Sequence, residues 1–165
     1  MRSGRHRSAL RRARRWVADC RAELFARWVA RASTDQLEAV MQSPLRGVLL
    51  WQVFRTMRQR FDGDRASGVD AVVEFRIRRS GAGRADCYQV MIAGGRCETT
   101  RGPRWAATVT LDMGAASFLR LVGGAAGAPK LVLLGKLRVW GDPLLAARLP
   151  GLLNIPRPPA SSRRR

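Results

Sequence analysis

The sequence predicts an α+β protein, and two observations lead to this prediction. Up to about residue 60, apolar residues recur every three or four positions, which is typical of amphipathic helices. After Gly68 the period changes to two, which is typical of half-buried strands. Because 165 residues are enough for one ordinary domain, we expect a single α+β domain with tails.

Two helices are predicted before the first strand. The first carries an apolar stripe within residues 10–30, and the second begins at a cap provided by Ser33 or Thr34. The stripe of the second helix consists of Leu37, Val40, Met41, Leu45, Val48, Trp51, Phe54 and Met57. Pro44 is expected to kink or divide this helix, and the Asp- and Gly-rich stretch at 61–68 is expected to be a loop.

Four strands are predicted to follow in succession. Their inward faces are expected to carry Val73, Phe75 and Ile77, then Tyr88, Val90 and Ile92, and, after a strand at 96–102, Ala107, Val109 and Leu111. Gly94 and Gly95 predict a turn between the second and third of these strands. The connections have no room for crossover helices, so we expect neighbouring strands to be antiparallel.

The C-terminal third is predicted to be helix, strand and helix. Helical spacing returns at 113–124, and LVLLGKLRVW (131–140) is expected to form a fifth strand, with Leu131, Leu133, Leu137 and Val139 on one face. Gly135 is expected to be a bulge or a point of close approach. Asp142 and Pro143 then predict the start of a leucine-rich helix, which Pro150-Gly151 is expected to break.

The net charge of +19 is concentrated at the ends of the chain. We expect a basic N-terminal extension with an amphipathic helix at 1–34, a folded domain at 35–154 and a disordered Pro/Arg tail at 155–165. The basic ends are open to three interpretations: solvated tails, attraction to an anionic membrane, or attraction to nucleic acid. Since 29 of the 31 basic residues are Arg, a general compositional bias explains them as well as a designed surface.

Several function classes find little support in the sequence. Three cysteines without metal-ligand spacing and a single histidine predict neither a metal site nor a cofactor, and no catalytic motif is present, so an enzyme is not expected. No recognition motif supports a specific nucleic-acid partner. The chain contains no long apolar run and no signal-peptide core, so we expect a cytoplasmic protein, with peripheral membrane contact as an option.

Gly135, Lys136, Leu137, Val139 and Gly141 form a pattern that a Leu/Ala-rich helix follows. In this pattern the C-terminal half resembles the sterol carrier protein type-two family. The preceding segment is similar too, with Phe118 and Leu119 before Gly123 and Gly124. The likeness covers residues 70–154 well and the preceding helix more loosely.

That resemblance implies a five-stranded, mainly antiparallel sheet covered by helices and enclosing an apolar tunnel. It also implies a non-catalytic carrier whose partner is a sterol, a fatty acid or a fatty acyl-CoA. The N-terminal segment up to about Asp35 and the long second helix depart from the family pattern, and either could cover or fill the tunnel. An interaction module with a closed core is therefore the alternative.

Candidate tunnel residues follow from the faces predicted above. They are Leu50, Phe54, Met57, Phe75, Val90, Phe118, Val122, Leu133, Leu144, Leu149 and Leu153. Burial of apolar surface can hold an acyl chain without polar anchors. The same periodicity fits an ordinary filled core, so for each of these residues both interpretations stay open.

Overall fold

The computed structural model describes residues 23–79 and 82–153. Residues 23–31 are helical. The elements that follow are α2 (Thr34–Gln42), α3 (Arg46–Arg60), β1 (Ala71–Arg79), β2 (Ala82–Ala93), β3 (Arg96–Arg101), β4 (Val109–Gly114), α4 (Ala115–Val122), α5 (Ala128–Leu133), β5 (Leu137–Gly141) and α6 (Pro143–Leu152).

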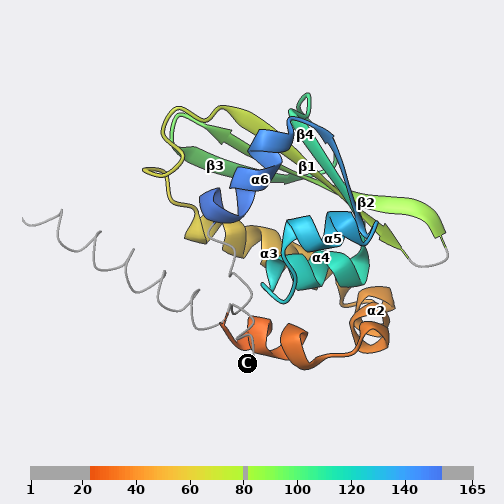
Figure 1. The fold of residues 1–165 in the computed structure, drawn as a ribbon. Coiled ribbons are helices and arrows are strands. Elements are labelled where there is room, and N and C mark those ends of the chain that lie inside the picture. The colour runs from red at the N-terminus through yellow and green to blue at the C-terminus, as the bar shows by residue number, and fades with distance from the viewer. Residues whose placement is uncertain (1–22, 80–81, 154–165) are drawn as a thin grey trace, which may run out of the picture.

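The five strands form one sheet in the order β3-β2-β1-β4-β5 (Figure 1). Three of the four pairings are antiparallel, which confirms the predicted α+β fold with a mainly antiparallel sheet. The pairing of β1 with β4 is parallel, so the expectation that the first four strands are all antiparallel neighbours was wrong. The reason is that segment 102–108 carries the chain from β3, at one edge, to the far side of β1, where Thr108 N–H donates to the Val72 carbonyl at 2.8 Å.

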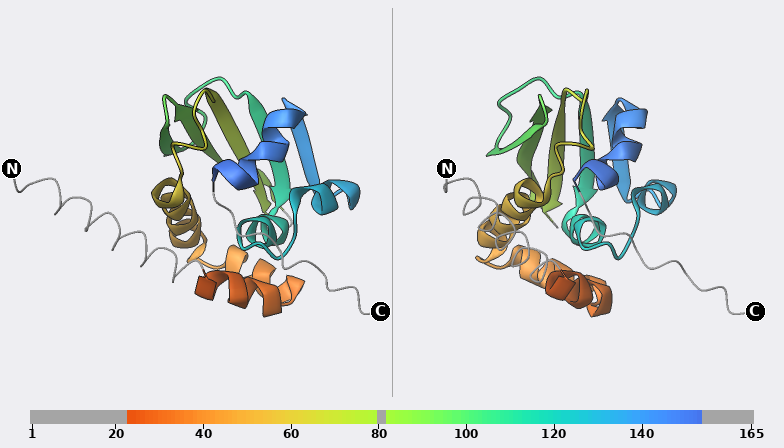
Figure 2. Two further views of the ribbon diagram at one scale, coloured as in Figure 1. Left: turned by 60° about the vertical axis from the view of Figure 1, so that its left-hand side comes forward. Right: turned by 90° about the vertical axis from the view of Figure 1, so that its left-hand side faces the viewer.

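The helices are arranged in two layers beyond the sheet. Helices α3, α4, α5 and α6 pack against the strands, and α2 packs mainly on α4, farther from the sheet (Figures 1 and 2). Residues 23–31 lie in this outer layer beside α2 (Figure 2). One core cluster runs through all the layers, from Val29 to Leu153.

The long second helix is divided at Ser43 and Pro44 into α2 and α3. Of the two predicted cap residues, Ser33 is the one that caps α2, and it forms a capping box with Gln36. The break changes the phase of α3, so the stripe predicted for one continuous helix is wrong at its middle three positions but correct at Phe54 and Met57. Leu45, Val48 and Trp51 are exposed, whereas Leu50, Val53, Phe54 and Met57 are buried.

The predicted fifth strand is also wrong in its first half. Leu131 to Leu133 belong to α5, and β5 begins only at Leu137. Gly135 has a φ of +65° and follows the end of α5. Its N–H bonds to the Val132 carbonyl at 2.9 Å, and the Lys136 N–H bonds to the Leu131 carbonyl at 2.8 Å. This pair of bonds is a Schellman helix end, which a glycine in the left-handed region favours, so Gly135 is not a bulge.

Two further expectations concern the ends of the chain. Within the first predicted helix, Val29 is buried while Leu24 and Trp28 are exposed, so the stripe is shifted from the one predicted. Residues 1–22 and 154–165, which include most of both basic ends, lie outside the described residues. In the part of the chain that is described, no helix has the length and apolarity to cross a membrane.

Candidate functional site

One face of the sheet is apolar across four strands, from β2 to β5. Register places Phe75 between Tyr88 on β2 and Leu111 on β4, and Leu111 opposite Val139 on β5. A second row joins Val90, Val73 and Val109. Because side chains alternate along each strand, these rows all face the same side, and the helices cover them. The site that we consider lies between this face and the helical layer.

Four aromatic rings meet at the centre of this layer. Phe54 of α3 stacks on Tyr88 with ring centroids 4.3 Å apart, and it also contacts Phe75 at 5.4 Å and Phe118 at 5.7 Å. Burial raises the pKa of Tyr88. The three phenylalanines are almost fully buried. Edge and offset contacts of this kind add to the energy of apolar burial, so this cluster holds α3 and α4 against the sheet.

Most of the predicted site residues lie in this interior. Leu50, Phe54, Met57, Phe75, Val90, Phe118, Val122, Leu149 and Leu153 are buried in the core cluster. The sequence reasoning left out Tyr88, Leu145 and Leu152, which are buried beside them. Tyr88 shares a strand face with Val90, and this alternation was the signal that could have included it.

Leu133 and Leu144 do not lie in the interior, so the expectation that they line a tunnel is not met. Leu133 is 87% exposed because it lies near the end of α5 and not on an inward strand face. Leu144 is 77% exposed because it lies in the first turn of α6, where Leu145 is the residue that packs inward.

Helix α6 covers the sheet at β4 and β5 (Figure 1). As predicted, Asp142 caps it, accepting hydrogen bonds from the amides of Leu144 at 2.8 Å and Leu145 at 3.1 Å. Pro150 does not break the helix, which continues to Leu152. The final turn keeps a hydrogen bond from the Leu153 amide to the Leu149 carbonyl at 2.9 Å, so one missing donor at Pro150 is tolerated.

The opposite face of the sheet is polar. Gln89 is fully buried there and donates from Nε2 to Glu74 Oε2 at 2.8 Å and to the Trp105 carbonyl at 2.9 Å. Its Oε1 accepts from the amides of Arg104 and Trp105. Burial by itself would raise the pKa of Glu74, but hydrogen bonds from Gln89 and Arg76 outweigh it and lower that pKa. These hydrogen bonds hold segment 102–108 against the sheet, so the role of Gln89 and Glu74 is structural.

The two described cysteines offer little nucleophilic chemistry. Burial raises the pKa of Cys87 to about 11 and that of Cys97 to about 12, so both thiols are protonated at neutral pH. Among residues 23–79 and 82–153, no group of three or more His, Cys, Asp or Glu side chains is placed to hold a metal ion.

The comparisons agree with this architecture. Residues 52–154 match the model of the SCP-2 sterol transfer family. The apo form of sterol carrier protein 2 from Yarrowia lipolytica is 22% identical, covers 64% of this chain and 90% of its own, and has a TM-score of 0.55. The ubiquinone synthesis protein UbiJ-SCP2 is 12% identical, covers 67% of this chain and 97% of its own, and has a TM-score of 0.52.

A third structure is a much larger protein. The stereoselective inverting sec-alkylsulfatase Pisa1 from Pseudomonas sp. is 18% identical and has a TM-score of 0.55; the match covers 61% of this chain but only 16% of the sulfatase. A search of curated proteins found no match. At these identities the solved structures show the fold alone.

Proposed function

The chain belongs to the SCP-2 sterol transfer family, and from this premise we propose that it is a non-catalytic carrier that binds an apolar lipid between its sheet and its helices. The observation that carries the proposal is the continuous apolar sheet face, closed on one side by the aromatic cluster and on the other by α6. Sterol, fatty acid and fatty acyl-CoA are the candidate ligand classes. Each presents a long apolar surface that this face can bury.

The leucines of α6 support this location for a ligand, because they face the same apolar layer. Leu145, Leu149 and Leu152 are buried, and Leu153 follows them at the end of the helix. The rings of Phe54 and Tyr88 are in contact. A bound lipid would therefore lie between α6 and the aromatic cluster only after the α6 leucines and these rings move apart. Movement of α6 away from β4 and β5 would provide that room, because it removes packing without breaking a strand pairing.

An interaction module with a closed core is the alternative. The close packing of Phe54 on Tyr88, Phe75 and Phe118 favours it, since a core filled by its own side chains needs no ligand. Under this alternative the basic ends become the part of the chain to study. The same experiment decides between the two functions.

The test combines native mass spectrometry of the purified protein with titration of a fluorescent fatty acid. We expect lipid to co-purify and the fatty acid to bind at one equivalent. In Leu149→Asp we expect binding at least about tenfold weaker, because a carboxylate would face the apolar layer. Leu144→Asp is the matched control on the same helix, and we expect it to bind like the wild type because Leu144 is exposed.

Two results would contradict the carrier function. One is a wild-type protein that is empty after purification and takes up no fatty acid, which would establish the closed core. The other is a Leu149→Asp protein that is folded by circular dichroism and binds fatty acid as tightly as Leu144→Asp. The wild-type measurement decides the matter even if Leu149→Asp does not fold.

A further inference from the structure

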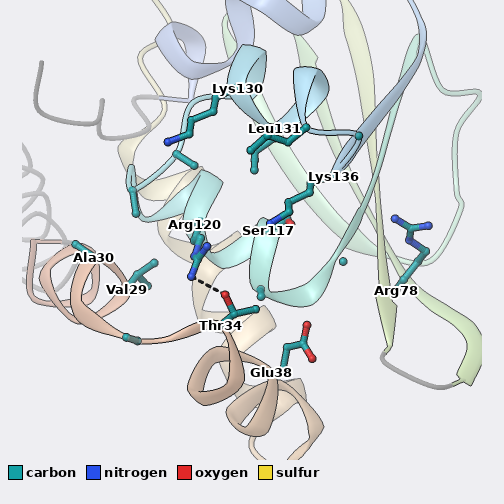
Figure 3. Close-up of a pocket in the computed structure, with 17 residues that line it drawn as sticks. Val29, Ala30, Thr34, Glu38, Arg78, Ser117, Arg120, Lys130, Leu131 and Lys136 are labelled. Carbon is teal, nitrogen blue, oxygen red and sulfur yellow. Dashed lines mark hydrogen bonds between the residues drawn. The ribbon is translucent and has the colours of Figure 1, made fainter. Parts of the chain in front are cut away.

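A hollow, which we call the basic groove, lies away from the apolar sheet face, between the outer helical layer and the α4–α5 region (Figure 3). It has a volume of about 440 Å³. Its walls come from residues 29–38 on one side, and from α4, α5 and residues 135–136, just before β5, on the other. The hollow therefore exists only because the N-terminal helices pack beside the part of the chain that matches the family.

Positive charge dominates the walls of this hollow. Arg78, Arg120, Lys130 and Lys136 line it, and Glu38 is the only acidic residue among the described residues that do so. Lys130 and Lys136 are the only two lysines in a chain with 29 arginines. Arg120 Nη2 donates to Thr34 Oγ1 at 2.8 Å, which orients its guanidinium across the groove (Figure 3). Arg78 is partly neutralised by an ion pair with Asp112, whose Oδ1 lies 3.0 Å from the Arg78 Nε.

An apolar tip adjoins the same hollow. Val132, Leu133 and Leu134 at the end of α5 are 48%, 87% and 55% exposed. Leu134 also lines the hollow. Lys130, Leu133 and Leu134 share one face of the helix because they are three and four positions apart. The Schellman bonds at Gly135 and Lys136 fix the chain just after the tip, and Lys136 lies two residues beyond Leu134.

We propose that the α5 tip (Val132–Leu134) and the basic groove beside it form a docking surface for a membrane that contains anionic phospholipid. The three apolar side chains enter the interfacial region, and Lys130, Lys136 and Arg120 contact lipid phosphates. Lysine suits this position because its long aliphatic stem can lie along apolar surface while its ammonium reaches the headgroups. Anionic lipid complements the charge of the groove.

A bilayer fits this surface better than a protein partner does. A stable protein interface needs roughly 800 Å² on each side with a packed centre, which three side chains at a helix end do not supply. Shallow insertion into a membrane needs only a few apolar side chains together with basic residues. The location also differs from the basic ends of the chain, which the sequence analysis considered for membrane contact.

The test is flotation of the full-length protein with vesicles of phosphatidylcholine, with and without phosphatidylglycerol. We expect binding only to the anionic vesicles. Lys130→Gln/Lys136→Gln should bind about thirtyfold more weakly, because each lysine near an anionic membrane surface adds its own electrostatic attraction to the binding. Leu133→Ser should bind about tenfold more weakly by loss of insertion, and the exposure of Leu133 makes it a safe change for folding.

The matched control for charge is Arg58→Gln/Arg96→Gln, which removes the same charge from exposed residues of α3 and β3, at the other edge of the sheet. We expect it to stay within about twofold of the wild type, because charges beyond a Debye length are screened. Equal losses in the two double variants would overturn the proposal, since attraction would then follow net charge alone. Binding of Leu133→Ser equal to that of the wild type would overturn it too.

A soluble phosphate compound could bind the same basic residues as a lipid phosphate does. Glycerol phosphate and inorganic phosphate are therefore titrated without vesicles. Tight binding that is lost in Lys130→Gln/Lys136→Gln and kept in Leu133→Ser would assign the groove to a free phosphate compound and overturn membrane docking. Because the vesicles carry no fatty acid, docking is measured independently of the carrier function, and each can fail without the other.

Discussion

Arg46 fastens the start of α3 to the sheet. Its Nε donates to Asp86 Oδ2 at 2.5 Å, Nη1 to the Met41 carbonyl at 3.0 Å and Nη2 to the Ile77 carbonyl at 2.9 Å. The sequence shows one more arginine among many, yet Arg46 is buried in the protein. It joins α2, α3, β1 and β2, so the orientation of Phe54 and the aromatic cluster depends on it.

Replacing Asp86 tests this anchor. Burial alone would raise the pKa of Asp86, but hydrogen bonds from Arg46 and Arg79 lower it below its usual value. A lowered folded-state pKa stabilises the fold above the ordinary carboxyl pKa, and this stability is lost as pH falls through the folded-state value. We expect Asp86→Asn to reduce the free energy of unfolding by about 3 kcal/mol at neutral pH, because Arg46 loses its counter-charge.

Urea unfolding as a function of pH measures this effect. The difference between the wild type and Asp86→Asn should be full above about pH 5 and should shrink in more acid solution, where the wild-type carboxylate becomes protonated. Glu98→Gln is the control: Glu98 lies 3.9 Å from Arg104 on the surface, and its loss should cost less than about 0.5 kcal/mol. A difference that does not change with pH would refute the electrostatic explanation.

Among the elements, α6 is well capped at its N-terminus but lacks a backbone hydrogen bond near its C-terminus. Asp142 satisfies two of the free amides in its first turn, and Pro150 removes a hydrogen bond in its last turn. Gly141 has a φ of +92°, and a side chain there would overlap the Thr108 carbonyl. The turn from β5 into α6 is therefore fixed, and any opening of the cover is expected at the C-terminal end of α6.

The cap at Asp142 gives a prediction for this element. Asp142→Ala should cost about 1 kcal/mol and increase amide hydrogen exchange chiefly within residues 144–149. Ser33→Ala removes the cap of α2 and should increase exchange in α2 instead. If Asp142→Ala increased exchange equally throughout the sheet, α6 would open only when the whole domain unfolds, and it would not serve as a separate cover.

At the scale of the whole molecule, the outer layer rests on a close contact with α4. Val29 is 1% exposed, and it packs at Gly123, just after the end of α4. A Cβ on Gly123 would lie 3.1 Å from the Cβ of Val29 and 2.9 Å from the Leu119 carbonyl oxygen. Only glycine allows the N-terminal helix to approach so closely, and this approach forms one wall of the basic groove.

A double-mutant cycle tests this contact. We expect Gly123→Ala to reduce the free energy of unfolding by about 2 kcal/mol through overpacking. Adding Val29→Ala should recover part of that loss, so that the double variant is more stable than the sum of the single changes predicts. Gly127→Ala is the control, because its new Cβ would meet only Pro129, at an ordinary 3.7 Å. Strict additivity in urea unfolding would show that Val29 and Gly123 do not interact.

The sequence alone determined the features that depend on nearby residues. Alternation of apolar residues placed Phe75, Val90 and Leu111 on inward strand faces, and Ser33 and Asp142 marked the starts of two helices. These features follow from periodicity and capping, which act over a few residues. The mainly antiparallel sheet and the family were predictable for the same reason, because their motifs are local.

Only the tertiary structure decided features that depend on distant contacts. The parallel pairing of β1 with β4 requires a crossing from one side of the sheet to the other, which no local pattern records. The segment Leu131–Leu134 is an uninterrupted apolar run that fits a strand as well as a helix, but its packing and the glycine at position 135 make it a helix end, so Leu133 lies outside. The burial of Arg46 and the basic groove arise where segments far apart in the sequence meet, because burial and charge clustering belong to the folded chain.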